Sequence, residues 1–143
     1  MKRFLPYILI ILLAFAGLVN AVLIHEKTAG SIVAPCFIVQ GCDTVLHSVY
    51  ARAFGEPLSV WGMIYYGLII IFSIGYMVDK KEYLRHMLMA IIAIGFACSL
   101  YFLYLQIFIL KTFCSYCLLS LIDTVALTFL MGWGMRGRSK ESK

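Results

Sequence analysis

The sequence predicts an all-α membrane protein, a four-transmembrane-helix bundle in one domain that covers residues 1–143. Hydrophobic residues make up 63% of the chain, and the mean hydropathy is +0.95, which is too apolar for an ordinary water-soluble domain. In addition, four stretches are apolar and long enough to cross a hydrocarbon core that needs about 20 helical residues. These stretches cover residues 6–24, 58–78, 87–110 and 114–135.

The first apolar stretch has two interpretations. Lys2 and Arg3 precede it, and the small-residue sequence Val19-Asn20-Ala21 lies near its end, as in a signal peptide with a cleavage site. However, the apolar run is longer than the roughly 7–15 residues that are usual in signal peptides. We therefore expect an uncleaved membrane anchor.

The basic residues predict the orientation, because cytoplasmic flanks and short loops collect Lys and Arg. One set of helix ends carries nine of them: Lys2, Arg3, Lys80, Lys81, Arg85, Arg136, Arg138, Lys140 and Lys143. The other set carries three: Lys27, Arg52 and Lys111. Both termini are thus expected in the cytoplasm, with loop 25–57 and turn 111–113 outside. The net charge of +5 reflects this topology and attraction to the lipid bilayer. The sequence shows no basic groove with interleaved aromatic residues, so the positive charge is no evidence for nucleic-acid binding.

Loop 25–57 is expected to cap the bundle with a short amphipathic helix. Apolar residues recur there at the spacing of one helical face: Val45, Leu46, Val49, Tyr50, Ala53 and Phe54. Gly55 suits the end of this helix, and Pro57 suits the start of the next. In helical register Cys42 falls on the apolar side and faces the bundle, whereas Cys36 is freer to meet an external partner.

Two closely spaced cysteine pairs lie on the predicted outer side, where disulfides persist. Cys36 and Cys42 are in the loop, and Cys114 and Cys117 open the fourth span. A bridge across three residues adds little stability, because it closes a tiny loop, whereas a helix N-terminus favours a thiolate. The second pair is therefore predicted to be a redox centre. Cys98, about 18 Å along its helix from the outer end, is interpreted as a packing residue.

These positions predict an electron relay. A thiol protein outside the membrane exchanges with Cys36, and Cys42 passes the electrons to the bridge between Cys114 and Cys117. The final acceptor must be lipid-soluble and take two electrons and two protons, which describes a quinone. No nucleotide, haem or iron–sulfur motif indicates another acceptor, and no metal is expected.

Two other functions stay open at this point. A non-enzymatic membrane protein would use the cysteines for structural disulfides or for zinc, which needs four convergent ligands. A DsbB-type thiol oxidase has the same four spans and the same quinone chemistry. It places its Cys-x-x-Cys in the first outer loop, whereas this chain has the opposite order.

Four sequence features follow one another along the chain: the Cys-x5-Cys of the first loop, Ser48 six residues later, the stretch GEPLSVWG, and the Cys-x-x-Cys that opens the last span. Together they resemble the vitamin K epoxide reductase family in its bacterial or archaeal form. The resemblance implies a four-helix bundle around a quinone (menaquinone, ubiquinone or a vitamin K type) in the cell (inner) membrane. It also implies that Cys36 and Cys42 form the shuttle pair, that Cys42 attacks Cys114, and that Cys117 reduces the quinone.

The resemblance further implies quinone contacts at Ser48, Leu58, Ser59 and Trp61. Phe113 is a further expected contact of the quinone. Gln106, one turn from the outer end of the third span, is expected either to bond a quinone oxygen or to satisfy a neighbouring helix.

The chain departs from the family pattern in two ways. Animal members place a tyrosine four residues beyond the second active-site cysteine, where this chain has Leu121, which favours plain quinone reduction over epoxide reduction. The thioredoxin-like domain that is fused to some bacterial members is missing. The redox partner is therefore expected to be a separate thioredoxin-like or DsbA-like protein.

Asp123 follows Cys117 by one to two helical turns within the fourth span. A carboxylate near the centre of a membrane costs up to about 3 kcal/mol on insertion scales, so it is expected to face protein or water. It is interpreted either as a proton relay coupled to quinone reduction or as a packing residue hydrogen-bonded to Ser120 or Thr124.

Overall fold

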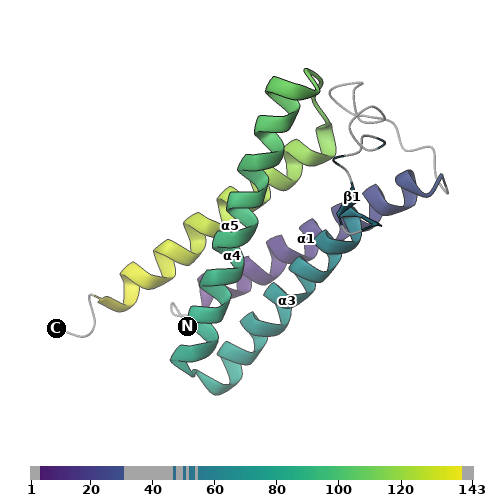
Figure 1. The fold of residues 1–143 in the computed structure, drawn as a ribbon. Coiled ribbons are helices and arrows are strands. Elements are labelled where there is room, and N and C mark those ends of the chain that lie inside the picture. Colours follow the sequence, from purple (N-terminus) through teal and green to yellow (C-terminus); the bar gives the residue numbers. More distant parts are fainter. Residues whose placement is uncertain (1–3, 31–46, 48–49, 51, 54, 140–143) are drawn as a thin grey trace.

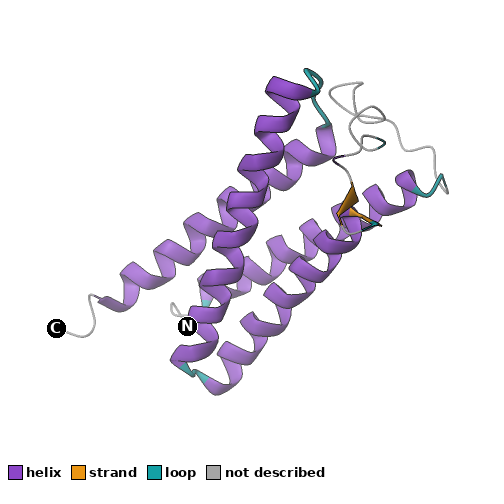
Figure 2. Cartoon of the chain, in the orientation of Figure 1, coloured by secondary structure: helices purple, strands orange, loops and turns teal. Residues whose placement is uncertain are grey.

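The computed structural model describes residues 4–30, 47, 50, 52–53 and 55–139, and within this part four long helices dominate (Figures 1 and 2). They are α1 (Leu5–Thr28), α3 (Leu58–Asp79), α4 (Glu82–Tyr104) and α5 (Ser115–Ser139). A two-stranded hairpin, β1 (Arg52–Ala53) and β2 (Glu56–Pro57), precedes α3, and the π-helical turn η2 (Leu105–Ile109) extends α4. Each long helix is long and apolar enough to cross a membrane, so the predicted four-helix membrane bundle is confirmed.

Consecutive helices run in opposite directions along the bundle. Figure 1 shows the two chain ends and the turn between α3 and α4 at one end of the molecule. The C-terminal end of α1, the start of α3 and the turn between η2 and α5 lie at the opposite end. The second end therefore collects the start of α5 and the hairpin.

Prolines and local polar contacts mark the helix ends. Pro6 lies in the first turn of α1, where its missing N–H removes no helical hydrogen bond. Pro57 is the N-cap of α3 and is extended, with φ −59° and ψ 140°. Lys80 ends α3 in the left-handed conformation, with φ 52°, and its N–H donates to the carbonyl of Tyr76 at 2.9 Å. These residues mark the start of α1 and the two ends of α3.

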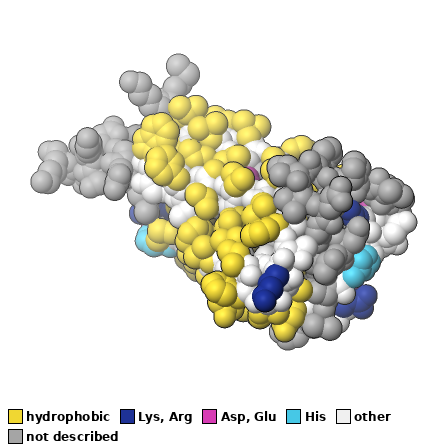
Figure 3. Space-filling view, turned by 90° about the horizontal axis from the view of Figure 1, so that it is seen from above, with side chains coloured by type: hydrophobic (Ala, Val, Ile, Leu, Met, Phe, Trp, Pro, Cys, Tyr) yellow, Lys and Arg dark blue, Asp and Glu magenta, His cyan; other side chains and the backbone are white. Residues whose placement is uncertain are grey.

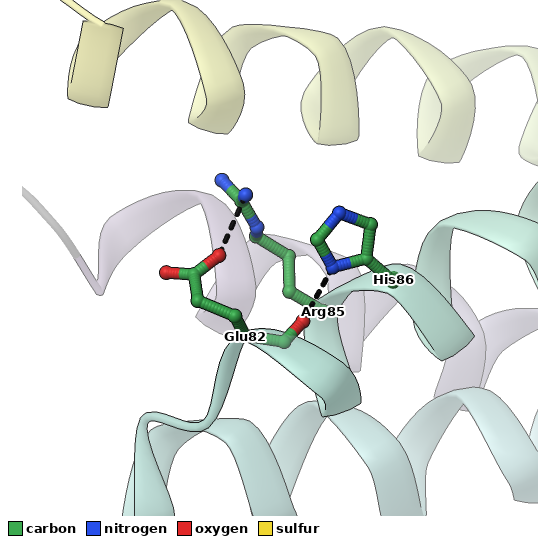
Figure 4. A network of polar contacts seen from close by, with 3 residues as sticks. All are labelled: Glu82, Arg85 and His86. Carbon is green, nitrogen blue, oxygen red and sulfur yellow. Dashed lines mark hydrogen bonds and ion pairs between the residues drawn. The ribbon is translucent and has the colours of Figure 1, made fainter.

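The first turn of α4 is held by the polar contacts drawn in Figure 4. Arg85 Nη2 lies 2.6 Å from Glu82 Oε2, and His86 Nδ1 lies 2.7 Å from the backbone oxygen of Glu82. A carboxylate in the first turn also suits the positive end of the helix dipole. This network supports the start of α4 next to the turn that follows α3.

Most apolar side chains of the four helices face outward. In the most apolar 18-residue window of each helix, at most 28% of the residues are buried. Val78 is 75% exposed and Phe129 is 70% exposed. Figure 3, which views the molecule from above, shows hydrophobic side chains over much of the described surface. Water-soluble monomeric proteins rarely expose this much apolar surface. The lipid bilayer is the solvent that fits it, and the protein is a multi-pass membrane protein.

The bundle interior depends on a close approach of α1 to its neighbours. The core includes Ile10, Ile69 and Leu127, which are fully buried. A Cβ atom added at Gly17 of α1 would overlap the ring of Tyr66 and would lie 2.7 Å from Asp123 Oδ2. Small residues at such contacts let helix backbones approach closely in membranes. Gly17 therefore makes room for one side chain from α3 and one from α5.

The helix predicted in the outer loop falls mostly on residues outside the described part of the chain. At its expected end the backbone is extended instead, because β1 pairs antiparallel with β2, Arg52 opposite Pro57 and Ala53 opposite Glu56. Gly55, between the strands, has φ +89°. Glycine in this conformation serves a tight turn as well as a helix C-terminus. The prediction of a helix that reaches residues 52 and 53 was therefore wrong.

Gly17→Ala tests the close approach of α1. The added methyl group is expected to overpack the contact with Tyr66 and Asp123 and to destabilise the protein by about 1–3 kcal/mol. The loss appears as a lower midpoint of thermal unfolding in detergent. Gly67→Ala is the matched control, because nothing lies within 4 Å of a Cβ at that position of α3. It should keep or raise the midpoint, and equal midpoints for the two variants would contradict the packing described.

Candidate redox site and the adjoining cavity

Cys114 and Cys117 stand together at the start of α5. The carbonyl of Cys114 accepts the N–H of Leu118 at 3.0 Å, which makes Cys114 the N-cap of the helix. Its side chain is fully buried, whereas that of Cys117 is half-buried. Both are free thiols, and the Cys117 side chain is hydrogen-bonded to the Cys114 sulfur. The other predicted pair, Cys36 and Cys42, lies outside the described residues.

Gln106 holds Cys114 in position. Its Oε1 atom accepts the backbone N–H of Cys114 at 3.0 Å, and its side chain is buried. Gln106 belongs to η2, where the N–H of Leu110 bonds to the carbonyl of Leu105 at 2.8 Å. Such π-helical turns occur frequently at functional sites. Of the two interpretations of Gln106, the contact with a neighbouring helix is thus observed.

The start of α5 lowers the pKa of the Cys114 thiol from the ordinary 9.0 to about 7. The largest cause is the hydrogen bond from the Cys117 side chain. Burial raises the pKa, but backbone hydrogen bonds from Cys117 and Tyr116 and the positive charge of Lys27 at the end of α1 lower it further. A thiolate is the nucleophilic form of cysteine. Near neutral pH, Cys114 is therefore ionised to a large extent.

A cavity of about 360 Å³ lies beside Cys117, enclosed by residues of all four long helices and η2. Cys117 lines it and Cys114 does not. Small-molecule sites have volumes of about 300–1,000 Å³ and mostly apolar walls with a few polar groups. Here the polar groups include Asn20, Ser59 and Ser120. The size and lining of the cavity are those of a site for a small, mostly apolar molecule.

The predicted quinone contacts divide into three groups. Leu58, Ser59, Trp61 and Gln106 line the cavity. Phe113 is exposed and is not among the residues of the cavity wall. Ser48 lies outside the described part. The structure thus brings four of the predicted side chains to one cavity with Cys117.

Cys98 is placed differently from its interpretation as a packing residue, which was wrong. Its side chain is exposed and lines the cavity. Ile94 and Phe102, one turn to either side on α4, line the same cavity. Residues four apart share one face of a helix, so Cys98 belongs to the α4 face that borders the cavity and not to a helix–helix contact.

Two polar residues that the sequence analysis did not identify tie the bundle together at the cavity. Asn20 Nδ2 donates to the carbonyl of Tyr116 at 3.1 Å and so joins α1 to the first turn of α5. Tyr66 O–H lies 3.1 Å from Ser120 Oγ and joins α3 to α5. A polar residue inside an apolar span is the signal that indicates such positions, because it needs a partner within the membrane.

The ring of Tyr65 packs against α4 at Gly95, where the helix has no side chain. A Cβ atom at Gly95 would overlap the ring of Tyr65, and both residues line the cavity. The Tyr65 hydroxyl is buried, without a hydrogen-bond partner among the described residues.

Within the described ranges, no group of three or more His, Cys, Asp or Glu side chains comes together in a way that could hold a metal ion.

Comparison with known protein families finds a match that covers most of the chain. The family model described as "Vitamin K epoxide reductase family" matches residues 8–131. The matched range contains the four helices of the bundle except for their outermost ends, and it includes all five cysteines.

The titration of Cys114 tests the electrostatics of the redox site. In reduced protein with Ala at positions 36, 42 and 98, the ultraviolet absorbance of thiolate is expected to rise with a midpoint near pH 7. Adding Cys117→Ala removes the strongest hydrogen bond to the sulfur, so this midpoint should move up toward 9. Adding Cys114→Ala instead should remove the step near pH 7. A midpoint that stays near 7 without Cys117 would contradict the assigned cause.

Proposed function

The chain belongs to the vitamin K epoxide reductase family, and on that premise we propose that it is a quinone-dependent thiol oxidoreductase. One observation carries the proposal: Cys117, one member of a closely spaced cysteine pair, lines a mostly apolar cavity inside a membrane bundle. A water-soluble oxidant has no need of such a cavity. A lipid-soluble acceptor that reaches the protein from the bilayer does.

The proposed relay starts with the loop pair. Thiolate Cys42 attacks the Cys114 sulfur of a Cys114–Cys117 disulfide and releases Cys117 as a thiolate. Cys36 then attacks Cys42, which closes the loop disulfide and releases Cys114. The low pKa of Cys114 favours this release, because a thiol of lower pKa is the better leaving group. A thioredoxin-like or DsbA-like protein in turn reduces the loop disulfide and is itself oxidised.

Cys117 completes the proposed cycle from its position in the cavity wall. Two electrons and two protons pass to a quinone of the menaquinone, ubiquinone or vitamin K type, which leaves as quinol, while Cys114 and Cys117 form their disulfide again. Leu58, Ser59, Trp61 and Gln106 are proposed to hold the head group, since all four line the cavity. Ser59 Oγ lies 3.3 Å from His25 Nδ1, which restrains its side chain.

The proposed orientation places the redox site on the extracytoplasmic face. Figure 1 shows both chain ends and the turn after α3 at one end of the bundle, and nine of the twelve Lys and Arg residues belong to these segments. Cytoplasmic segments collect such residues. The Cys114–Cys117 pair starts at the opposite end, where an extracytoplasmic partner protein would meet it.

Quinol formation by the purified protein tests the proposed function. With a reduced thioredoxin-like protein and a soluble quinone, the wild-type protein is expected to form quinol and to oxidise one dithiol per quinol. Cys117→Ala should reduce the rate to that of the partner and quinone alone. In Cys36→Ala, which lacks the thiol that resolves it, a Cys42–Cys114 mixed disulfide should accumulate. Full activity of Cys117→Ala would exclude the relay.

A cavity-filling pair of variants tests where the quinone binds. Leu121 lines the cavity, whereas Leu119, two residues away, is 47% exposed and does not. Leu121→Trp is expected to fill the cavity and to raise KM for the quinone at least tenfold, the effect of losing about 1.4 kcal/mol of binding. Thiol exchange between the partner and the cysteines should persist. Leu119→Trp is the control, and an equal KM for both variants would place the quinone elsewhere.

A further inference from the structure

A polar cluster next to the cavity takes no part in the thiol steps. It consists of Tyr66 on α3 and Ser120 and Asp123 on α5. Tyr66 and Ser120 line the cavity, with their hydroxyl oxygens 3.1 Å apart. Asp123 stands behind them, because its Oδ2 atom and the Tyr66 ring flank the same position at Gly17 of α1.

The Asp123 carboxyl group shares a hydrogen bond with the Tyr66 side chain. One of its oxygens, Oδ2, is buried and makes no hydrogen bond within the described residues. The described ion pairs, Lys81 with Asp79 and Arg85 with Glu82, lie near the turn between α3 and α4 and do not include Asp123. A carboxylate inside a membrane helix costs about 2.5–3.5 kcal/mol. Ionisable residues at such a cost are usually functional.

Quinone reduction has a requirement that such a group meets. A quinone carries its two oxygens at opposite ends of the ring, and each must receive a proton. Cys117 approaches the cavity from the outer end of α5, and Ser120 follows it by one helical turn. A single thiol cannot protonate both oxygens, so a second donor is needed on another side of the cavity.

We propose that Asp123 stores a proton for quinone reduction and delivers it into the cavity through Tyr66 and Ser120. This inference rests on the proposed function. As Tyr66 or Ser120 gives its hydroxyl proton to a quinone oxygen, the Asp123 carboxyl group replaces that proton. The electrons come from Cys114 and Cys117, which form their disulfide. Asp123 is left as a carboxylate and takes up a proton from water.

Besides Asp123 Oδ2 and the Tyr65 hydroxyl, a third buried polar atom of the described residues has no hydrogen-bond partner. Ser73 Oγ is buried and makes no hydrogen bond within the described residues. Ser73 lies two turns beyond Tyr66 on the buried face of α3, toward the end of the bundle where the chain ends lie. Buried polar groups without a protein partner are where internal waters bind. We therefore assign the reprotonation of Asp123 to this side of the bundle.

A single-turnover experiment on the whole protein isolates this step. Protein reduced in advance is mixed with a soluble quinone, and quinol absorbance is followed across a range of pH. Asp123→Asn is expected to slow quinol formation on the order of 100-fold, the size of a typical general-acid contribution, while disulfide exchange with the partner protein persists. Asp123→Glu should restore part of the rate. Thr128→Ala, one turn farther along α5 and exposed, is the control.

The pH profile separates proton delivery from a packing role. In the described part of the chain, the ionisable side chains that face Asp123 are Tyr65 and Tyr66 of α3. Cys98 of α4 lies on the other side of Tyr65. From α1, the residue next to Asp123 is Gly17, which carries no charge. The wild-type rate should fall at high pH as Asp123 loses its proton, and Asp123→Asn should lack this fall. The infrared C=O band of a protonated carboxyl group should be present in the wild-type protein and absent in Asp123→Asn.

The outcomes separate the two proposals. If wild-type protein forms no quinol, the proposed function fails. If wild-type protein forms quinol and Asp123→Asn matches its rate and pH profile, only the proton route is overturned. Should Asp123→Asn fail to fold, the double variant Tyr66→Phe, Ser120→Ala decides the question, because it removes both hydroxyl groups of the route. A slower rate supports the route, and an unchanged rate refutes it.

Discussion

The hydrogen bond from the Cys114 N–H to Gln106 Oε1, 3.0 Å long, is the contact on which the redox centre depends. A helix that starts near a membrane leaves its first N–H groups without helical partners, and no water is at hand to satisfy them in the hydrocarbon region. In this protein the η2 turn supplies an amide oxygen for one of them, and the Cys114 sulfur accepts two others, from Tyr116 and Cys117. The hydrogen bonds from Tyr116 and Cys117 therefore satisfy backbone N–H groups and stabilise the thiolate at the same time.

Apolar packing between these helices gains little from the hydrophobic effect, because lipid is as apolar as the side chains it contacts. Three polar contacts of 3.1 Å join the helices around the cavity: Asn20 with Tyr116, Tyr66 with Ser120, and Thr124 with Ser99. Polar contacts of this kind contribute roughly 0.6–2 kcal/mol each in membranes. Since all of them border the cavity, its shape and the stability of the bundle rest on the same side chains.

Sequence reasoning found the four helices and the second cysteine pair, because bilayer thickness sets helix length and because cysteine chemistry is specific. It did not find which side of each helix faces inward. These helices are apolar nearly all round, so no polar face identifies the opposite, buried one. This is why Cys98 was assigned to packing from its depth alone, and why Asn20 and Tyr66 were missed. The hairpin was missed because Gly55 fits a helix end and a tight turn equally well.

The full burial of Cys114 has a consequence for the lifetime of the protein. A thiolate at neutral pH is the form that peroxides oxidise, first to sulfenic acid and then irreversibly to sulfinic acid, but susceptibility also requires solvent access. Cys114 combines a low pKa with a side chain of 0% exposure. Its sulfur is closed to solvent, so small oxidants in the surrounding medium do not reach it. The fold thus protects the thiol with the lowered pKa from chemical ageing.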